Sequence, residues 1–448
     1  MPAKPPATSG ARMYWNRLYG LRSYVRSSLW LVPLIALPLN FILTRIIHAL
    51  GVRLGWDFMG FGLTGAQALF EAILTMALSF LVFTFGSLLV VIQVASGQLT
   101  SRVIATTLLR DKVVRYTVGL FTLTLLFAVS ALGRLEGTVN QFALFVAALL
   151  GLSCLAAFLY LIDYTARRLR PISILMDVGN AGLAVIDSLY RHASITPDPA
   201  TQASGILDRS TRVVTQTGSS EIILAIQVGT LVDLAKTANG IIEFVPLVGD
   251  FVAAEDPLFK LHGGASAIDD EKLRATVAFG SERTVEQDPT FSFRIVVDIA
   301  LRALSPAIND PTTAVLALDQ LHRMLRKVGQ RTLHTHEVCD TAGELRVIIK
   351  SPCWEDFVHL ALCEIRYCGS NNMQIVRRMR SMLDNLLETL PRHRHPPLLQ
   401  ELSLLDREAA RHFIYPEDLA LARIGDSQGL GGHAVDEPAH RTPISTSS

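Results

Sequence analysis

Hydrophobic residues are concentrated in the first third of the chain, in four long runs over residues 29–50, 66–95, 113–132 and 139–162. Each run approaches the roughly 20 residues that a helix needs to cross about 30 Å of hydrocarbon. No later run is comparable in length. The pattern therefore predicts a transmembrane domain of four helices over residues 29–162. Pro33 and Pro38 are expected to kink the first helix.

After the fourth run, helical spacing continues over residues 163–203, and Pro171 marks a bend where this connector leaves the membrane surface. Residues 204–280 change to short β-rich runs such as "TRVVTQTG" and "EIILAIQVG", with one helical run, "TLVDLAKTAN". A turn is expected at Gly249-Asp250. This segment predicts a small α+β domain, close to a compact barrel with one helix.

Helical spacing returns from residue 289 onward. In "FSFRIVVDIALRAL", Phe291, Ile295 and Ile299 lie near one face. We expect a helical cytosolic domain over residues 281–423, and a disordered tail over residues 424–448, which are rich in Gly, Ser and Pro. The predicted fold class is an α+β membrane protein, in which four transmembrane helices precede a small β-barrel-like α+β unit and a helical bundle.

Basic residues lie mostly on one side of the predicted membrane domain. Segment 1–28 carries Lys4, Arg12, Arg17, Arg22 and Arg26. The loop after the second run carries Arg102, Arg110 and Lys112, and the end of the fourth run carries Arg167, Arg168 and Arg170. The opposite side has Arg45, Arg53 and Arg134. Basic residues favour the cytoplasmic side, so both termini are predicted to be cytoplasmic.

Composition agrees with a membrane part joined to a soluble part, since 50% of residues are hydrophobic, 18% are charged and the mean hydropathy is +0.35. The net charge of +1 gives no indication of nucleic-acid binding. The five cysteines form no CxxC pair, which argues against a zinc ribbon or a disulfide framework. Phosphate-loop, dinucleotide, catalytic-triad and zinc signatures are absent, so the sequence predicts no cofactor, no metal centre and no enzyme.

Two polar residues of the second run, Glu71 and Gln93, are candidates for function. Ionisable groups inside membrane segments often mark ion pathways or proton relays. Glu71 lies near one end of its run, so exposure at the membrane surface is the alternative. Small residues of this run, including Ser79 and Gly86, favour close helix packing.

The stretch "DIALRALSPAINDPTTAVLALDQL" places polar turn residues between two helical runs. Pro306 should stop the first helix near Ser305. Asp310 followed by Pro311 is a strong helix start, with Asp310 as N-cap. A helix corner explains Pro306, Asp310 and Pro311 without any function, but it does not explain the presence of Ser305 and Asn309.

A site at this corner is the alternative. Upstream, "GSERTVEQDPTF" adds Arg283, Glu286 and Asp288, and the first helix adds Asp298 with Arg302 one turn later. If the segments meet, Arg283 could pair with Asp310 or Asp298, or the acidic residues could hold a hard cation through oxygen ligands. The candidate ligand- or ion-binding residues are Arg283, Glu286, Asp288, Asp298, Ser305, Asn309 and Asp310.

The stretch "FGSERTVEQDPTFSFRIVVDIALRALSPAINDPTTAVLALDQL" resembles the predicted bacterial membrane proteins of domain-of-unknown-function family 2254, in which ERT, EQD, DIA-ALSP and NDP-TA follow in this order. "SGQLTSRVIATTLLRDKVVRYTVG" and "GDFVAAEDPL" resemble two further segments, although Ser101 stands where Pro is usual and Glu255 or Asp256 where Gly is expected. The resemblance covers most of residues 20–370. It implies four helices in a bacterial inner membrane followed by a cytosolic domain, and it implies no reaction.

Two functions are compatible with these patterns. An oligomeric channel- or transport-type protein, gated or assembled by its cytosolic domain, needs Gln67, Glu71 and Gln93 to face an oligomer axis. A non-transporting sensor or scaffold needs the 283–313 cluster to bind a ligand or ion, or to hold subunits together. The expected partners are the lipid bilayer and further copies of the chain, and the sequence does not specify the ligand or ion.

Overall fold

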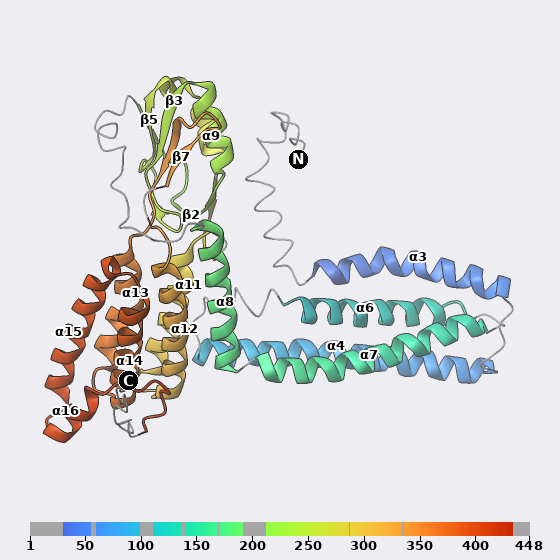
Figure 1. Cartoon of the computed structure of the whole chain (residues 1–448). Helices are drawn as coiled ribbons and strands as arrows, with labels where there is room; N and C mark the ends of the chain where they lie inside the picture. The colour runs from blue at the N-terminus through green and yellow to red at the C-terminus, as the bar shows by residue number, and fades with distance from the viewer. Residues whose placement is uncertain are drawn as a thin grey trace, which may run out of the picture.

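The computed structural model of the protein describes residues 30–54, 60–98, 111–135, 139–168, 170–190, 212–285, 287–333 and 336–432. Four long helices form an elongated bundle that projects to one side of the remaining elements (Figure 1). They are α3 (Leu31–Leu54), α4 (Leu63–Gln98), α6 (Lys112–Leu132) and α7 (Gln141–Arg168). α6 packs against the other three and is the most deeply buried of them.

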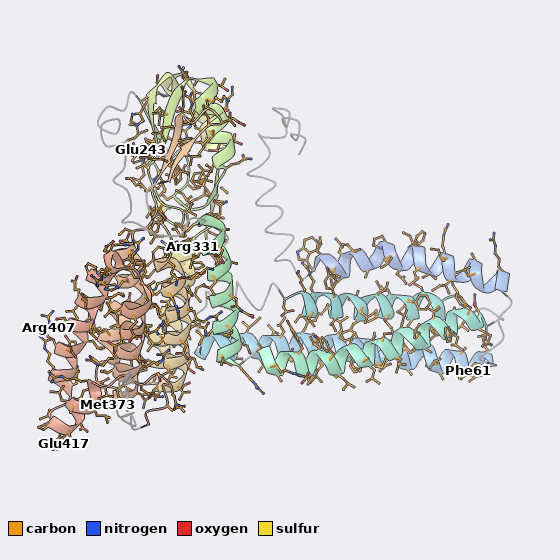
Figure 2. The ribbon with its side chains drawn as sticks, viewed as in Figure 1. Phe61, Glu243, Arg331, Met373, Arg407 and Glu417 are labelled. Atoms are coloured by element: carbon orange, nitrogen blue, oxygen red, sulfur yellow. The ribbon has the colours of Figure 1, made fainter. Side chains whose placement is uncertain are left out.

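Polar contacts join the helices of this bundle. Asn40 of α3 donates to the Ser130 hydroxyl of α6 at 2.9 Å, and the Cys154 thiol of α7 donates to the Thr124 hydroxyl of α6 at 3.1 Å. At the end farthest from the sheets, the Gln141 amide donates to the Phe61 carbonyl at 2.9 Å (Figure 2). Large apolar side chains on the outer faces of α3, α4 and α7 are exposed, as a lipid-facing surface requires.

Five of the described helices are long and apolar enough to cross a membrane, with candidate spans Leu31–Gly51, Leu63–Gln93, Lys112–Leu132, Gln141–Arg167 and Ile172–Leu189. The first four coincide with the predicted runs. The fifth belongs to α8 (Pro171–Leu189), which begins at the predicted bend and runs across the direction of the bundle (Figure 1). The predicted count of four is therefore not confirmed by length and composition alone.

α8 packs along two helices of the C-terminal half, α11 (Pro289–Ala303) and α12 (Pro311–Gly329). The approach is close, because a Cβ atom on Gly182 would lie 2.8 Å from the Ser292 Cβ and 2.9 Å from the Met324 Cε. Asp187 pairs with Lys327 at 2.9 Å and also with Arg331, which is labelled beside α8 in Figure 2. α8 is thus an integral part of the helical domain.

The described strands form two sheets. The five-stranded sheet has the order β1 (Arg212–Thr215), β5 (Pro257–Gly263), β3 (Gly240–Phe244), β8 (Leu345–Ile349), β7 (His336–Cys339), and the three-stranded sheet has the order β4 (Phe251–Val252), β2 (Glu221–Ile226), β6 (Val277–Gly280). Helix α9 (Val228–Thr237) packs on β3 and β8, and 3-10 helix η3 (Gly264–Ala267) and helix α10 (Asp270–Arg274) complete the unit. The strands and helix predicted within 204–280 are present, so the α+β class is confirmed. A barrel-like closure is not, because the described strands remain in two separate sheets.

Two strands of the larger sheet, β7 and β8, come from the segment that the sequence pattern assigns to the helical domain. β8 pairs in parallel with β3, matching Ile242 with Val347, whereas every other pair of described strands is antiparallel. Residues 281–423 therefore contribute to both units. The chain passes from the sheets into α11 and α12, returns to the sheet, and leaves it again.

The helical domain has one continuous hydrophobic core, which includes Ile186 of α8, Phe293 of α11 and Trp354 of α13. Its further helices are α13 (Trp354–Gly369), α14 (Met373–Thr389), η4 (Arg392–Arg394), α15 (His395–His412) and α16 (Pro416–Ala422). Ile92 of α4 packs against this core as well. The end of α4 nearest the sheets is therefore in direct contact with the helical domain.

The first residues of the predicted disordered tail make defined contacts. The guanidinium of Arg377, only 1% exposed, donates to the carbonyls of Ile424 and Gly432 at 3.1 and 2.8 Å. The Asp426 carboxylate accepts from the backbone N–H groups of three residues that follow it, Gln428, Gly429 and Gly431. The remainder, residues 433–448, and the basic segment 1–28 lie outside the described residues.

Candidate functional site

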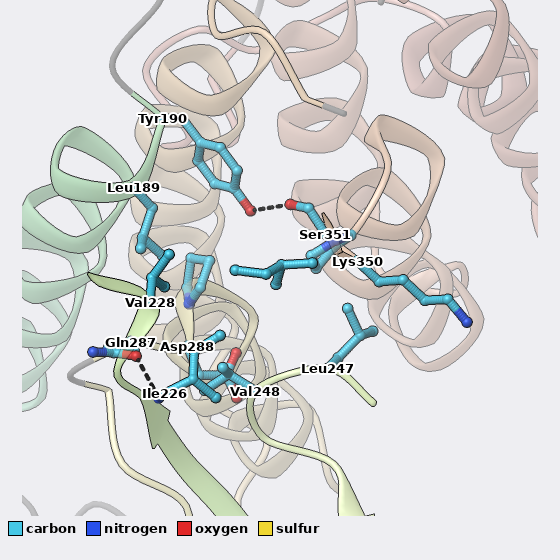
Figure 3. A pocket seen from close by; sticks show the side chains of 13 residues that line it. Leu189, Tyr190, Ile226, Val228, Leu247, Val248, Gln287, Asp288, Lys350 and Ser351 are labelled. Atoms are coloured by element: carbon cyan, nitrogen blue, oxygen red, sulfur yellow. Dashed lines mark hydrogen bonds between the residues drawn. The ribbon is translucent and has the colours of Figure 1, made fainter. Parts of the chain in front are cut away.

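A cavity of about 160 Å³ lies where the sheets meet the helical domain (Figure 3). Its walls come from the end of α8, the end of β2 with the start of α9, the β3–β4 turn, the start of α11, and the link from β8 to α13. Most of its lining is apolar, including Leu189, Val228, Leu247, Val248 and Ile349. Five segments far apart in sequence therefore enclose one space.

Asp288 lines this cavity and caps α11. Its Oδ1 atom accepts from the Phe291 N–H at 3.1 Å and from the Thr290 hydroxyl at 2.5 Å. Its Oδ2 atom is buried and has no hydrogen-bond partner among the described residues, and the residue is only 2% exposed. Burial raises the pKa of Asp288, and the bonds from Thr290 and Phe291 and the charge of Arg283 oppose that rise without cancelling it.

Gly249 of the β3–β4 turn lies against this carboxylate. Its backbone is in the left-handed region (φ +96°), and a Cβ atom there would overlap the Asp288 Oδ2 atom. Beside it, the Gln287 side-chain oxygen accepts from the Ile226 N–H at 3.1 Å (Figure 3). The "GDFV" and "EQD" segments, which both carry the family resemblance, therefore meet at the cavity.

Tyr190, directly after α8, forms the opposite wall. Its hydroxyl and the Ser351 hydroxyl are 3.0 Å apart and hydrogen-bonded (Figure 3). Burial raises the pKa of Tyr190 to about 12; the bond with Ser351 acts against the rise and the charge of Asp288 adds to it. Tyr190 therefore stays neutral at physiological pH.

The polar corner at 305–310 is a separate feature. The Asp310 carboxylate caps α12 by accepting from the Thr313 N–H at 3.1 Å, Pro311 is the first helical residue, and Asn309 has a left-handed backbone (φ +48°). The Ser305 hydroxyl donates to the Arg302 carbonyl at 2.7 Å. The predicted helix corner is confirmed, and α11 ends two residues before Ser305.

The predicted 283–313 cluster divides into two parts. α11 has 15 residues, a length of about 22 Å, and it separates Asp288 from Asp310. Asp298 lies between them and pairs with Arg294 at 2.5 Å, while Arg283 is exposed near Asp288. Glu286 lies outside the described residues. Asp288 and Asp310 therefore cannot share one ion, and over the described ranges no three His, Cys, Asp or Glu side chains are grouped to hold a metal.

Two residues of the cavity, Tyr190 and Ser351, were not among the predicted site residues, and neither was Gly249, which lies against Asp288. The position of Gly249 in a turn could be predicted from the sequence, since "VGDF" between two strands marks a tight turn. Tyr190 and Ser351 carried no such signal, because their contact depends on how α8 and β8 come together.

The predicted membrane residues lie on one exposed face of α4. The Gln67 amide donates to the Glu71 carboxylate at 2.9 Å, and both side chains are exposed. At spacings of three, four or seven residues, which a helix brings to one side, this face continues with exposed residues. Its polar or small residues are Glu71, Thr75, Ser79, Gly86 and Gln93, which we refer to as the α4 polar face. The exposed side chains of Leu78, Val82 and Leu89 lie between them at the same helical spacings.

Long apolar helices followed by a mixed sheet and a helical domain define a multi-pass membrane protein with an α+β extramembrane part. The sequence pattern of the predicted membrane proteins (DUF2254) matches residues 26–385, so the chain belongs to that family and contacts the lipid bilayer. This confirms the resemblance seen in the sequence.

Two relatives are uncharacterised proteins, Mb1321c of Mycobacterium bovis and Rv1290c of Mycobacterium tuberculosis. Each is 24% identical over 430 residues, which cover 91% of this chain and 81% of the relative. No solved structure matches the chain.

Proposed function

We propose that the protein is a homo-oligomeric channel- or transport-type protein of the bacterial inner membrane, with a cytosolic domain that gates or assembles it. The α4 polar face carries this proposal. The proposal includes no catalysed reaction and no cofactor.

Polar side chains are costly to expose to lipid. A carboxylate at the centre of a membrane helix costs about 2.5–3.5 kcal/mol on insertion scales, so such groups usually face other helices or water. The Glu71 carboxylate accepts from the Gln67 amide of the same helix, and the Thr75 hydroxyl donates to the Glu71 backbone carbonyl at 2.8 Å. Parallel copies arranged around an axis would remove the α4 polar face from lipid and line a polar path with it.

A position at the membrane surface would explain Glu71 alone. α4 has 36 residues, a length of about 54 Å, so its ends extend beyond about 30 Å of hydrocarbon. Ser79 and Gly86 lie about 12 and 22 Å further along the helix than Glu71. Surface exposure does not account for these deeper positions, which is why the whole face, and not one carboxylate, supports self-association.

Four spans, α3, α4, α6 and α7, fit this assignment better than five. α8 buries its apolar face against α11 and α12, and its Asp187 pairs with Lys327 of α12. These contacts would be lost if α8 crossed the membrane alone. With four spans both termini are on the same side, and the distribution of basic residues favours the cytoplasm.

The cytosolic domain contacts the helix that carries the polar face. Ile92, one residue before Gln93 of that face, packs against the core of the helical domain. α7 leads into α8 across residues 169 and 170. A rearrangement of the helical domain would therefore act on α4 and α7 together.

Ion flux through proteoliposomes tests the proposal. The wild-type protein should conduct, and Glu71→Ala should abolish or strongly reduce the flux. Leu152→Ala, on the exposed face of α7 where Leu152 is 65% exposed, is the matched control and should conduct like the wild type. Sealed wild-type liposomes would reject the channel assignment.

A second candidate function is a non-transporting sensor or scaffold. The junction cavity beside Asp288 favours it, because a ligand there would contact α8, the sheets and α11 at once. Sealed liposomes together with a specific ligand at the cavity would select this function.

A further inference from the structure

The junction cavity combines an apolar enclosure with one buried acidic group. Apolar side chains such as Leu189, Val228 and Leu247 form most of its wall. Asp288 is one of its lining residues, and the Oδ2 atom of this side chain, which lies against Gly249, has no hydrogen-bond partner in the described parts of the chain. A buried carboxylate without a compensating donor or cation is destabilising, so a group that supplies one has a specific reason to bind.

The basic side chains nearest to the cavity do not fully compensate the buried charge of Asp288. The Lys350 side chain extends away from the cavity in Figure 3. Arg283 is exposed, and its charge only partly offsets the effect of burial on Asp288. A cation that approaches through the cavity would therefore stabilise the charged form of Asp288, which burial disfavours.

The size of the cavity limits what could enter. Its volume of about 160 Å³ is close to the roughly 150 Å³ of an engineered apolar cavity that holds benzene. A ligand of about six non-hydrogen atoms fits such a space. On the opposite wall, the hydroxyl groups of Tyr190 and Ser351 offer further acceptors for N–H groups.

We propose that the junction cavity binds a small organic ammonium compound, with its short apolar body against Leu189, Val228 and Leu247 and its ammonium group at Asp288. Asp288 is only 2% exposed, so full contact requires the β3–β4 turn at Val248 and Gly249 to shift. Binding would thereby couple the turn to α8 and α11. This inference does not depend on the α4 polar face.

The test uses the full-length protein in nanodiscs and two probes of matched shape, n-butylammonium chloride and neutral 1-butanol, with binding followed by calorimetry. We expect the wild type to bind butylammonium at least tenfold more tightly than butanol. Asp288→Asn should weaken butylammonium binding at least tenfold, because Asn keeps the helix cap and removes the charge. Asp310→Asn makes the same exchange at the cap of α12 and should leave binding unchanged.

A second variant keeps the test independent of Asp288. Val248→Trp fills the cavity from the turn and should abolish binding of both probes. Absence of butylammonium binding to the wild type would overturn the inference, and so would equal affinity for butanol or an unaltered affinity in Asp288→Asn. Because the assay measures neither oligomer formation nor flux, its failure is distinct from a failure of the channel proposal.

Discussion

Gly249 meets two constraints at once: its backbone is left-handed (φ +96°), and the Asp288 carboxylate occupies the space where a side chain would begin. Gly218 has almost the same backbone (φ +95°) but no heavy atom within 4 Å of its would-be Cβ. Substitution of Gly218 therefore adds backbone strain alone, whereas substitution of Gly249 adds backbone strain and steric overlap.

Gly218→Ala should destabilise the protein by about 1–2 kcal/mol, the cost of a left-handed backbone for an L-residue. Gly249→Ala should cost about 1–3 kcal/mol more, because the methyl group overlaps the carboxylate. Thermal unfolding of the purified full-length variants measures this difference. Equal losses in the two variants would show that Gly249 does not contact Asp288.

Asp288 also predicts a pH dependence. Because its pKa is raised from 3.8 in the folded protein, the folded state retains this proton at pH values where the unfolded chain has lost it. The contribution of Asp288 to stability therefore falls as the pH rises from the ordinary value through the raised one. Asp288→Asn lacks this proton, so its melting temperature relative to the wild type should increase as the pH rises above about 4. A difference that is constant with pH would contradict the burial of this carboxylate.

The site residues that could be predicted from the sequence are those whose contacts form within a few neighbouring residues. The cap at Asp310 and Pro311 is formed within four residues and was predicted from the sequence. The contact between Gly249 and Asp288 joins two segments across the fold, and no local pattern specifies it. The proposed grouping of Asp288 with Asp310 overlooked the length of α11 between them.

At the scale of elements, α8 has the length and hydropathy of a membrane-spanning helix and the contacts of a helix inside the helical domain. Its length and hydropathy qualify it as a membrane span, yet Ile174, Leu175 and Ile186 are buried in the core of the helical domain. Packing against α11 and α12 therefore determines its environment. The sequence pattern predicted a helical connector over residues 163–203 with a bend at Pro171, where α8 begins, but not the partners of α8.

Gly182→Val should disrupt this packing, since the added side chain would meet Ser292 and Met324. Overpacking of this kind costs about 1–3 kcal/mol. Ala184→Val makes a similar addition on the exposed side of α8 and is the control. Limited proteolysis of the detergent-solubilised protein should cleave the α7–α8 region faster in Gly182→Val only. Equal rates for both variants would argue that α8 is not docked.

The strands β1 to β6 were predicted because each is a short β-rich run bounded by turn residues. β7 and β8 were missed because β8 lies between helices and finds its place beside β3 by parallel pairing. Such a pairing brings together residues far apart in the chain, and a five-residue run of four apolar residues and Arg346 does not specify it.

At the scale of the whole molecule, the number of spans decides which side of the membrane holds the C-terminal half. Four spans leave both termini on one side, and a fifth at α8 would separate them. We expect green fluorescent protein fused to either terminus of the full chain to fluoresce in the cytoplasm. Alkaline phosphatase fused after residue 135, at the outer end of the third span, should be active. A non-fluorescent C-terminal fusion with a fluorescent N-terminal one would mean that α8 crosses the membrane.

The division into a membrane bundle and an extramembrane α+β part followed from the hydrophobic runs, because membrane-spanning length is a property of each segment alone. The proposed assembly of several copies depends on which faces of those helices remain polar once the bundle has packed. The exposed positions of Thr75, Ser79 and Gly86 became evident only from the structure.

Cysteine cross-linking in native membranes tests self-association through the α4 polar face most directly. Ser79→Cys would be compared with Leu152→Cys on α7, after replacing the four cysteines outside the membrane segments, Cys339, Cys353, Cys363 and Cys368, by Ala. We expect oxidation to link Ser79→Cys chains into dimers and to leave Leu152→Cys chains monomeric. Monomers at Ser79→Cys, or equal cross-linking at both positions, would contradict assembly through α4.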